Sequence, residues 1–295
     1  MGEANTRDLA GSVWDQQSIW SQTANHLKAR IDRLRSTMLA LTVAAAVLTT
    51  LAAQIASLGS TIGRVLALGA GVSVGLVPLV RSQLGAQAVS EWARTRSVSE
   101  ELKAEAFRFL AEVTPFRGAD RESLLAERVG RVRDEAADLL VHTTGVAPVV
   151  RQPPAVHDVD SYVAVRLEPQ IAWYRGRSVS LARRLARARG CEVALGVLGV
   201  VLGAAASAFA VDEVSAWVAV VATVTAALSS HVAGSRWEYQ LVEYLRTADE
   251  LERMREDWSI ADRSEEASDR LVDRCEHVVS IQNDGWMAKW KADLR

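Results

Sequence analysis

Two long apolar blocks interrupt the mixed polar and apolar pattern of this chain. Residues 38–80 and 193–235 hold only three charged side chains, Arg64, Asp212 and Glu213, whereas charges are dense elsewhere. A soluble core does not segregate charge in this way, because each of its helices keeps a polar face toward water. The alternative, four helices buried in a soluble bundle, would need such a face on each helix. The pattern therefore predicts membrane-spanning helices.

Each block divides into two spans with a very short connection between them. The spans are Met38–Leu58, Val65–Val80, Val193–Val211 and Val214–Ser235. A 21-residue span such as the first forms about 31 Å of helix, which matches the hydrocarbon thickness of a bilayer. The second span is short, and we expect it to recruit Ile62–Gly63 and the charge-poor SQLGAQAVS after Arg81. The four spans are expected to form two tight helical hairpins.

Basic residues gather at one end of each hairpin. They comprise Lys28, Arg30, Arg33 and Arg35 before the first span, Arg81, Arg94 and Arg96 after the second, and six arginines within residues 175–189 before the third. The hairpin connections carry one arginine in the first pair and two acids in the second. The positive-inside bias predicts a multi-pass protein of the inner (plasma) membrane with both termini and the central segment in the cytoplasm.

Outside the blocks the apolar residues follow helical spacing. After the second span the helical set is Val98, Leu102, Ala106, Phe109, Leu110 and Val113. A second set further along the chain is Leu124, Leu125, Val129, Val132, Ala136, Leu139 and Leu140. After the fourth span the set is Trp237, Leu241, Tyr244, Leu245, Ala248, Leu251 and Trp258. The second and fourth spans are expected to continue as helical rods into the cytosol. The fold class is thus an all-α membrane protein with long cytosolic helical extensions.

The polar and titratable residues offer little chemistry. The net charge of −2 predicts no nucleic-acid partner, and two distant cysteines, Cys191 and Cys275, indicate no disulfide framework. Walker A, Ser-His-Asp and metal-spaced His/Cys patterns are absent from the sequence. His157, Asp158 and Asp160 lie in a loop without a fourth ligand, and Cys275 and His277 would point to different faces of a helix. We expect no enzyme activity, no metal and no cofactor.

The two halves of the chain repeat one ordered pattern. Gln17-Ser-Ile-Trp20 before the first hairpin parallels Gln170-Ile-Ala-Trp173 before the second, and Ser99-Glu-Glu-Leu102 parallels Ala248-Asp-Glu-Leu251. Residues 143–160 contain three prolines and no apolar period. These features predict a first domain at 1–142, a linker at 143–160 and a second domain at 161–295.

The second half resembles a known family. It contains the stretch Arg166-Leu-Glu168-Pro-Gln170-Ile-Ala-Trp173-Tyr174, which is followed by a basic helix and a two-helix hairpin. This order is similar to the SLATT family of bacterial two-transmembrane effector domains, with Gln170, Trp173 and Tyr174 as the motif residues. Glu276, Gln282 and Trp286 resemble the closing helix of that family, with glutamine where an acid is common. The stretch WDQQSIWSQTANHLKARIDRLRSTML in the first half resembles a second, divergent SLATT copy.

The resemblance implies a membrane effector that is proposed to form pores in bacterial conflict (antiphage) systems. Such effectors are often encoded beside nucleotide-second-messenger enzymes or nucleotide-sensing domains. No sensor is fused within this sequence, so the trigger, a nucleotide or a protein, stays open. The expected partners are membrane lipid, further copies of the chain and permeating ions.

A polar stripe on the first span predicts a pore face. The stripe consists of Thr50, Gln54 and Ser57, with Thr42 and Thr49 beside it. The competing stripe on the fourth span consists of Thr225 and Ser229, with Thr223 and Ser230 beside it. Hydrogen bonding between helices inside the bundle is the alternative reading of either stripe.

Glycine pairs predict close helix packing and an oligomer. Gly71 and Gly75 lie four residues apart, as do Gly199 and Gly203, so each pair shares one helix face. An oligomeric pore or ion channel is the leading functional hypothesis. The alternatives are a membrane-anchored scaffold that recruits cytosolic partners and, less favoured because no charge lies at mid-membrane, a small transporter.

Overall fold

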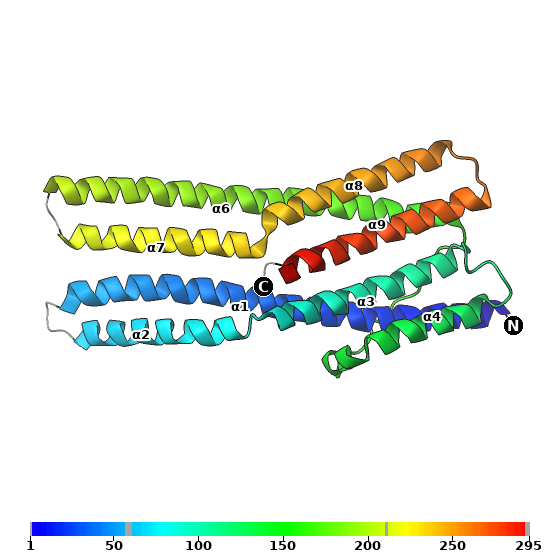
Figure 1. The fold of residues 1–295 in the computed structure, drawn as a ribbon, viewed down its shortest axis with the longest axis horizontal. Coiled ribbons are helices and arrows are strands. Elements are labelled where there is room, and N and C mark those ends of the chain that lie inside the picture. Colours follow the sequence, from blue (N-terminus) through cyan, green and yellow to red (C-terminus); the bar gives the residue numbers. More distant parts are fainter. Residues whose placement is uncertain (1, 57–60, 210–211, 293–295) are drawn as a thin grey trace. The chain divides into compact units, whose positions relative to one another are not determined.

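A computed structural model of the protein describes residues 2–56, 61–209 and 212–292, and no strand occurs in these ranges. The longer helices are α1 (Gly2–Ala56), α2 (Thr61–Ser82), α3 (Ala86–Leu110), α4 (Arg121–Glu135), α6 (Glu168–Phe209), α7 (Asp212–Ser235), α8 (Trp237–Ile260) and α9 (Glu265–Ala292) (Figure 1). Shorter elements are a 3-10 helix, η1 (Ala137–Thr143), a single turn, α5 (Val159–Tyr162), and a π-helix, η2 (Val163–Leu167). The predicted all-helical fold is confirmed.

The chain forms two compact units, and each takes segments from both halves of the sequence. We call residues 30–85 and 179–241 the membrane unit, and residues 1–29, 86–178 and 242–295 the polar unit. The predicted division at residues 1–142, 143–160 and 161–295 follows the sequence rather than these spatial units, and it stays a prediction.

The membrane unit contains the predicted spans as helices. Four helices of the described chain are long and apolar enough to cross a membrane, and each contains the described part of one predicted span; the ends of the first and third spans, residues 57–58 and 210–211, lie outside the described residues. In the first hairpin α2 follows α1, and a β-carbon on Gly69 would lie 3.4 Å from Leu48 Cδ1. In the second hairpin α7 follows α6 (Figure 1). Large apolar side chains such as Val65, Leu68, Val193 and Val200 are exposed, which is the surface that lipid tails would cover.

Two predicted continuous rods are interrupted, and this corrects the sequence interpretation. α2 ends at Ser82 rather than continuing through SQLGAQAVS, because the Gln83 and Leu84 amides turn back to the carbonyls of Val80 and Arg81 before α3 begins. α7 and α8 are separated by Arg236, whose φ of 52° lies in the left-handed region. A single residue in that conformation ends one helix and redirects the next.

The polar unit has a well-packed core centred on α3. Leu102, Phe109 and Val113 are fully buried, and α3 packs against α4 and α9. The predicted apolar faces are confirmed for Val98 and Ala106 on α3, for Leu125, Val129 and Val132 on α4, and for Ala248, Leu251 and Trp258 on α8, which are all buried. Two members of the predicted faces, Leu140 and Leu245, are exposed instead. Edge-to-face aromatic contacts join Phe107 to Trp14 and to Tyr162. This core brings α1, α3 and the segment before α6 together.

The predicted linker is mostly non-helical, and part of it is held against α1. The Val149 amide donates to Ser18 Oγ at 2.9 Å, and Gln22 Nε2 donates to the Ala147 carbonyl at 2.7 Å. At the end of the linker, Asp158 and Ser161 form a capping box that starts α5. These contacts give the connection between the two halves a defined path through the polar unit.

Candidate functional site: a threonine-lined groove in the membrane unit

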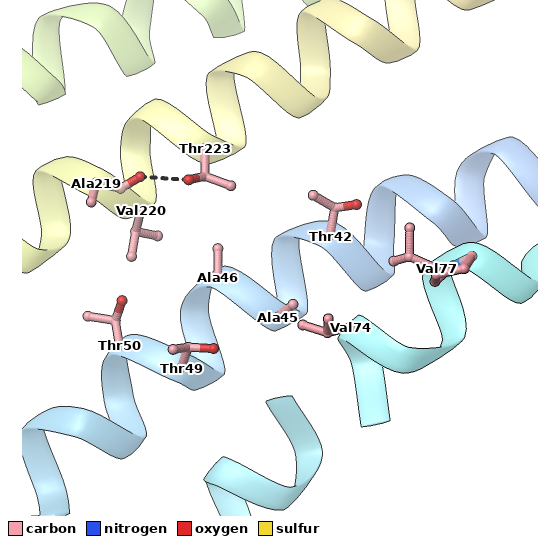
Figure 2. Close-up of a pocket in the computed structure, with 11 residues that line it drawn as sticks. Thr42, Ala45, Ala46, Thr49, Thr50, Val74, Val77, Ala219, Val220 and Thr223 are labelled. Atoms are coloured by element: carbon pink, nitrogen blue, oxygen red, sulfur yellow. Dashed lines mark hydrogen bonds between the residues drawn. The ribbon is translucent and has the colours of Figure 1, made fainter. Parts of the chain in front are cut away.

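A groove of about 580 Å³ lies among three helices of the membrane unit. α1 contributes Thr42, Ala45, Ala46, Thr49 and Thr50; α2 contributes Val74, Val77 and Pro78; α7 contributes Ala219, Val220 and Thr223. Figure 2 shows Thr42, Ala46 and Thr50 along the side of α1 that faces Val220 of α7. The lining is apolar apart from the threonine hydroxyls.

Helical periodicity explains why these residues share the groove. The five residues from α1 follow the spacing i, i+3, i+4, i+7 and i+8, which is one face of an α-helix. Alanine at positions 45 and 46 leaves space that a larger side chain would fill. Small residues on one face of α1, which is a single uninterrupted helix, therefore leave the space of the groove.

The threonine hydroxyls are compatible with either water or a weakly held cation. Thr42 Oγ1 donates to the Met38 carbonyl at 2.9 Å, and Thr223 Oγ1 donates to the Ala219 carbonyl at 2.9 Å. A hydroxyl that donates its proton to its own helix keeps oxygen lone pairs available. Such oxygens can accept a hydrogen bond from water or face a cation, and they lower the cost of a polar species in an apolar surrounding.

The structure brings together residues from both predicted polar stripes. Thr42, Thr49 and Thr50 of the first span share the groove with Thr223 of the fourth, so the two stripes that compete in the sequence meet in space. Gln54 is half-buried, engages in a polar interaction and does not line the groove. Ser57 lies outside the described residues.

The remaining residues of the fourth-span stripe have other surroundings. Thr225 Oγ1 donates to the Val221 carbonyl at 2.8 Å, and Ser229 Oγ donates to Glu192 Oε1 at 2.6 Å. Ser230 is exposed. None of the three lines the groove. That any residue of either stripe lines a pore stays a prediction.

The predicted packing glycines differ in what they contact. A β-carbon built on Gly199 would lie 3.5 Å from Val221 Cγ1, so this glycine faces α7. The same construction at Gly71, Gly75 and Gly203 meets nothing within 4 Å among the described residues. Within one chain only Gly199 of these four faces another helix closely.

The polar unit contains a buried charged cluster that the sequence analysis missed. Arg166, Glu276 and Tyr162 are all buried, and the Tyr162 hydroxyl donates to Glu276 Oε1 at 2.8 Å. The Arg166 guanidinium also lies over the Phe107 ring, with its central carbon 4.9 Å from the ring centroid. Arg166 belongs to the π-helix η2, an element that is rare and often found at functional sites.

Glu100 on α3 extends this cluster. Its carboxylate lies 2.6 Å from Arg96 Nη2, 3.4 Å from Lys103 Nζ and 3.9 Å from Arg166 Nη2. Burial by itself raises the pKa of Glu100, but Lys103 and the two neighbouring guanidinium groups outweigh burial and lower this pKa to about 2. Burial likewise raises the pKa of Glu276, yet Arg166 and the Tyr162 hydroxyl bring that pKa below its ordinary value. Both carboxylates are therefore charged at neutral pH.

The cluster carries little signal in the sequence. Arg166 and Glu276 occur in the family-like motifs, but they are far apart in the chain, and nothing in a single sequence pairs them. The motif residues themselves lie nearby on α6. Trp173, Tyr174 and Tyr244 form an aromatic cluster, with ring centroids 4.9 Å apart for Trp173 and Tyr174 and 5.6 Å for each contact with Tyr244. Gln170 is half-buried.

The loop acids have structural partners. Asp158 accepts the Ser161 amide at 2.7 Å as part of the capping box, and Asp160 Oδ1 accepts the indole N–H of Trp258 at 2.9 Å. In the part of the chain that the structure describes, no group of three or more His, Cys, Asp or Glu residues is arranged to hold a metal ion.

These features define the class of protein: an all-helical membrane protein whose four candidate spans are arranged as two hairpins. Residues 162–286 match the family model for the SMODS and SLOG-associating 2TM effector domain 1. The chain therefore carries a SLATT effector domain in its second half, as the motif around Gln170, Trp173 and Tyr174 predicts.

The first half matches a second family model. Residues 18–124 are similar to a family described as a protein of unknown function (DUF4231). No curated protein and no solved structure matches the chain. The two matches cover separate halves, each with its own membrane hairpin, whereas a tandem pair of SLATT copies stays a prediction.

Proposed function

We propose that the protein is an oligomeric pore-forming membrane effector, or ion channel, that is controlled through its polar unit. The observation that carries this proposal is the groove in which Thr42, Thr49 and Thr50 of α1 meet Thr223 of α7. A purely anchoring hairpin has no need for hydroxyls gathered around an unfilled space between its helices.

One copy supplies too few helices to surround a wide aqueous path. In this proposal, several copies assemble so that their grooves together line the path, and the threonine oxygens partly replace the water around a permeating ion. The membrane unit would then act as the wall of the pore, and its exposed valine and leucine side chains would face lipid or neighbouring copies.

Control is proposed to pass along continuous helices. α1 and α6 each contain residues of both the polar unit and the membrane unit. A ligand or protein that rearranges the polar unit would therefore move helices that also contribute to the spans. In line with the SLATT domain, we propose a role in bacterial conflict, with both termini in the cytoplasm and the spans in the inner membrane.

Reconstitution tests the proposal. The full chain in liposomes should conduct ions, and its particle mass in detergent should exceed that of one copy. Ala46→Phe should reduce flux at unchanged mass, because the larger side chain fills the groove. The matched control is Val200→Phe on the exposed surface of α6, which should conduct normally. A monomer without flux would instead favour a membrane-anchored scaffold that recruits partners.

A further inference from the structure

Three arginines on α6 have no acidic partner among the residues whose side chains the structure describes. Arg183, Arg184 and Arg187 are exposed, and no ion pair, hydrogen bond or ring contact involves them within the described ranges. They lie in the membrane unit, a few residues before the charge-free stretch that begins at Val193. Three like charges at this spacing repel one another, so a bound anion would lower the electrostatic energy of the folded chain.

Other arginines of the same helix are partnered. Arg175 pairs with Glu252, Arg189 pairs with Glu238, and the Arg177 guanidinium lies 5.6 Å from the Trp173 ring centroid. The chain thus supplies acids or an aromatic ring to the arginines on either side, and among the residues whose side chains are described it offers no partner to the central three. We call Arg183, Arg184 and Arg187 the arginine stripe.

The arginine stripe lies on the side of α6 that carries lipid-exposed residues further along. At roughly 100° per residue, Leu198 lies about 20° around the helix from Arg187, and Val201 about 40°. Leu198 is 45% exposed and Val201 57% exposed. Leu185, about 160° from Arg187, is buried instead. The stripe therefore faces outward, in line with Leu198 and Val201, which are one part of an exposed apolar surface that also includes Val200, about 140° from Arg187.

The distance along the helix fits the headgroup layer. At about 1.5 Å per residue, Arg187 lies about 9 Å before Val193, and Arg183 about 15 Å before it. The headgroup region is roughly 5–8 Å thick on each side of the hydrocarbon. The long side chain of Arg187 reaches phosphate groups in this layer. Arg183 and Arg184 lie further from the layer, at a distance comparable to the Debye length of about 8 Å, so they still attract these phosphates electrostatically.

We propose that the arginine stripe is a binding site for the phosphate of an anionic phospholipid whose acyl chains lie along Leu198 and Val201. Guanidinium groups bind phosphate oxygens through paired, charge-assisted hydrogen bonds. A zwitterionic lipid such as phosphatidylcholine offers the same phosphate with a compensating cation. The site therefore selects a net negative lipid such as phosphatidylglycerol.

Cys191 provides a probe beside the site. It lies four residues after Arg187, hence one turn further along the same face, and it is exposed, whereas Cys275 is fully buried. A thiol-reactive fluorophore therefore labels Cys191 in the otherwise unaltered full chain. The labelled protein is placed in nanodiscs that contain brominated phosphatidylglycerol or brominated phosphatidylcholine at equal mole fraction, and quenching reports which lipid occupies the neighbouring position.

The expected result is preferential quenching by the anionic lipid. Each basic residue near the surface contributes about 1 kcal/mol, so a preference of at least about fivefold is expected for the unaltered chain. Replacing all three stripe arginines with glutamine should reduce the preference below about twofold. Arg189→Gln is the matched control, because Arg189 is paired with Glu238, and it should keep most of the preference.

Several outcomes would overturn the proposal. Equal quenching by the two lipids in the unaltered chain would do so without any variant, as would a triple variant that keeps the full preference. An Arg189→Gln effect as large as that of the triple variant would show a general charge effect. Loss of the preference in inorganic phosphate, but not in chloride at the same ionic strength, would assign the stripe to free phosphate. Because quenching requires no ion flux, the test is independent of the proposed pore.

Discussion

The Arg166 guanidinium donates two hydrogen bonds to the Glu276 carboxylate, from Nε to Oε1 at 2.9 Å and from Nη2 to Oε2 at 2.8 Å. Both side chains are buried, and the pair joins the segment before α6 to α9 within the polar unit. A bidentate pair fixes the orientation of both groups as well as their distance. Because both groups are buried, loss of either one would leave the other charge without its bidentate partner.

Removing one member of this pair should destabilise the fold severely. Arg166→Ala leaves Glu276 charged and buried without its main partner, which costs about 3–5 kcal/mol. The double variant Arg166→Met, Glu276→Leu should recover most of this loss, because neither charge remains buried alone. Thermal unfolding in detergent, followed by tryptophan fluorescence, measures both variants. Equal destabilisation by the single and double variants would contradict the interpretation.

The polar unit should lose stability in acid through Glu100. Its pKa of about 2 in the folded chain lies below the value of about 4.3 in an unfolded chain. The folded state therefore binds this proton more weakly, and the resulting stability, about 3 kcal/mol, is present at neutral pH and lost as the pH falls from about 4.3 toward 2.

Glu100→Gln tests the acid effect directly. The variant should flatten the dependence of stability on pH in that window, although its stability at neutral pH is lower because Lys103 and Arg96 lose a partner. Glu127→Gln, at an exposed position on α4, is the control and should leave the curve unchanged. An unaltered slope in Glu100→Gln would show that other groups cause the acid sensitivity.

Two threonines on α7 separate a pore-lining role from hydrogen bonding inside the bundle. Thr223 lines the groove, whereas Thr225 does not. In a Cys191→Ser, Cys275→Ser background, Thr223→Cys and Thr50→Cys should react with a small hydrophilic thiol reagent and lose flux. Thr225→Cys should react more slowly by about tenfold or more, because a thiol outside the water path is desolvated. Reaction at Thr225 alone would place the path on another face of α7.

The glycines separate packing within a chain from packing between chains. Leucine at Gly199 should disturb the α6–α7 hairpin, because a β-carbon at this position would lie 3.5 Å from Val221 Cγ1 and the rest of the side chain would need further space. A β-carbon at Gly71 or Gly75 would meet no described atom of a neighbouring element within 4 Å, so we expect one copy to tolerate Gly71→Leu and Gly75→Leu. If these two glycines form the subunit interface, both variants should lower the particle mass in detergent. An unchanged mass in both would exclude that face of α2 as the interface.

The proposed topology predicts which positions react from outside the cell. Val150 in the linker is 96% exposed, so Val150→Cys is a reporter for the central segment, and Thr61→Cys reports on the start of α2. In a Cys191→Ser background, an impermeant maleimide should label Thr61→Cys in intact cells and Val150→Cys only after permeabilisation. The reverse pattern would invert the orientation.

The helical class of each element was predictable, because the spacing of apolar residues that indicates a helix depends only on residues close together in the chain. Leu102, Ala106 and Phe109 repeat at helical spacing whatever they contact, and their burial follows from that spacing. The break at Arg236 was not predictable, because left-handed backbone at an arginine has no signal in residue type. The end of α2 had a weak signal in Gly85, which the charge-poor neighbouring residues obscured.

The sequence by itself determined the helical class, the four spans, their pairing into hairpins and the SLATT motif, because charge segregation and periodicity depend only on residues close together in the chain. The tertiary structure alone decided that Thr42 and Thr50 share a groove with Thr223, that Arg166 meets Glu276, and that Arg183, Arg184 and Arg187 have no protein partner among the described residues. Each of these depends on which helix faces which across more than thirty residues of chain. Such long-range relations are set by packing and by the pairing of buried charges, and a linear pattern does not contain them.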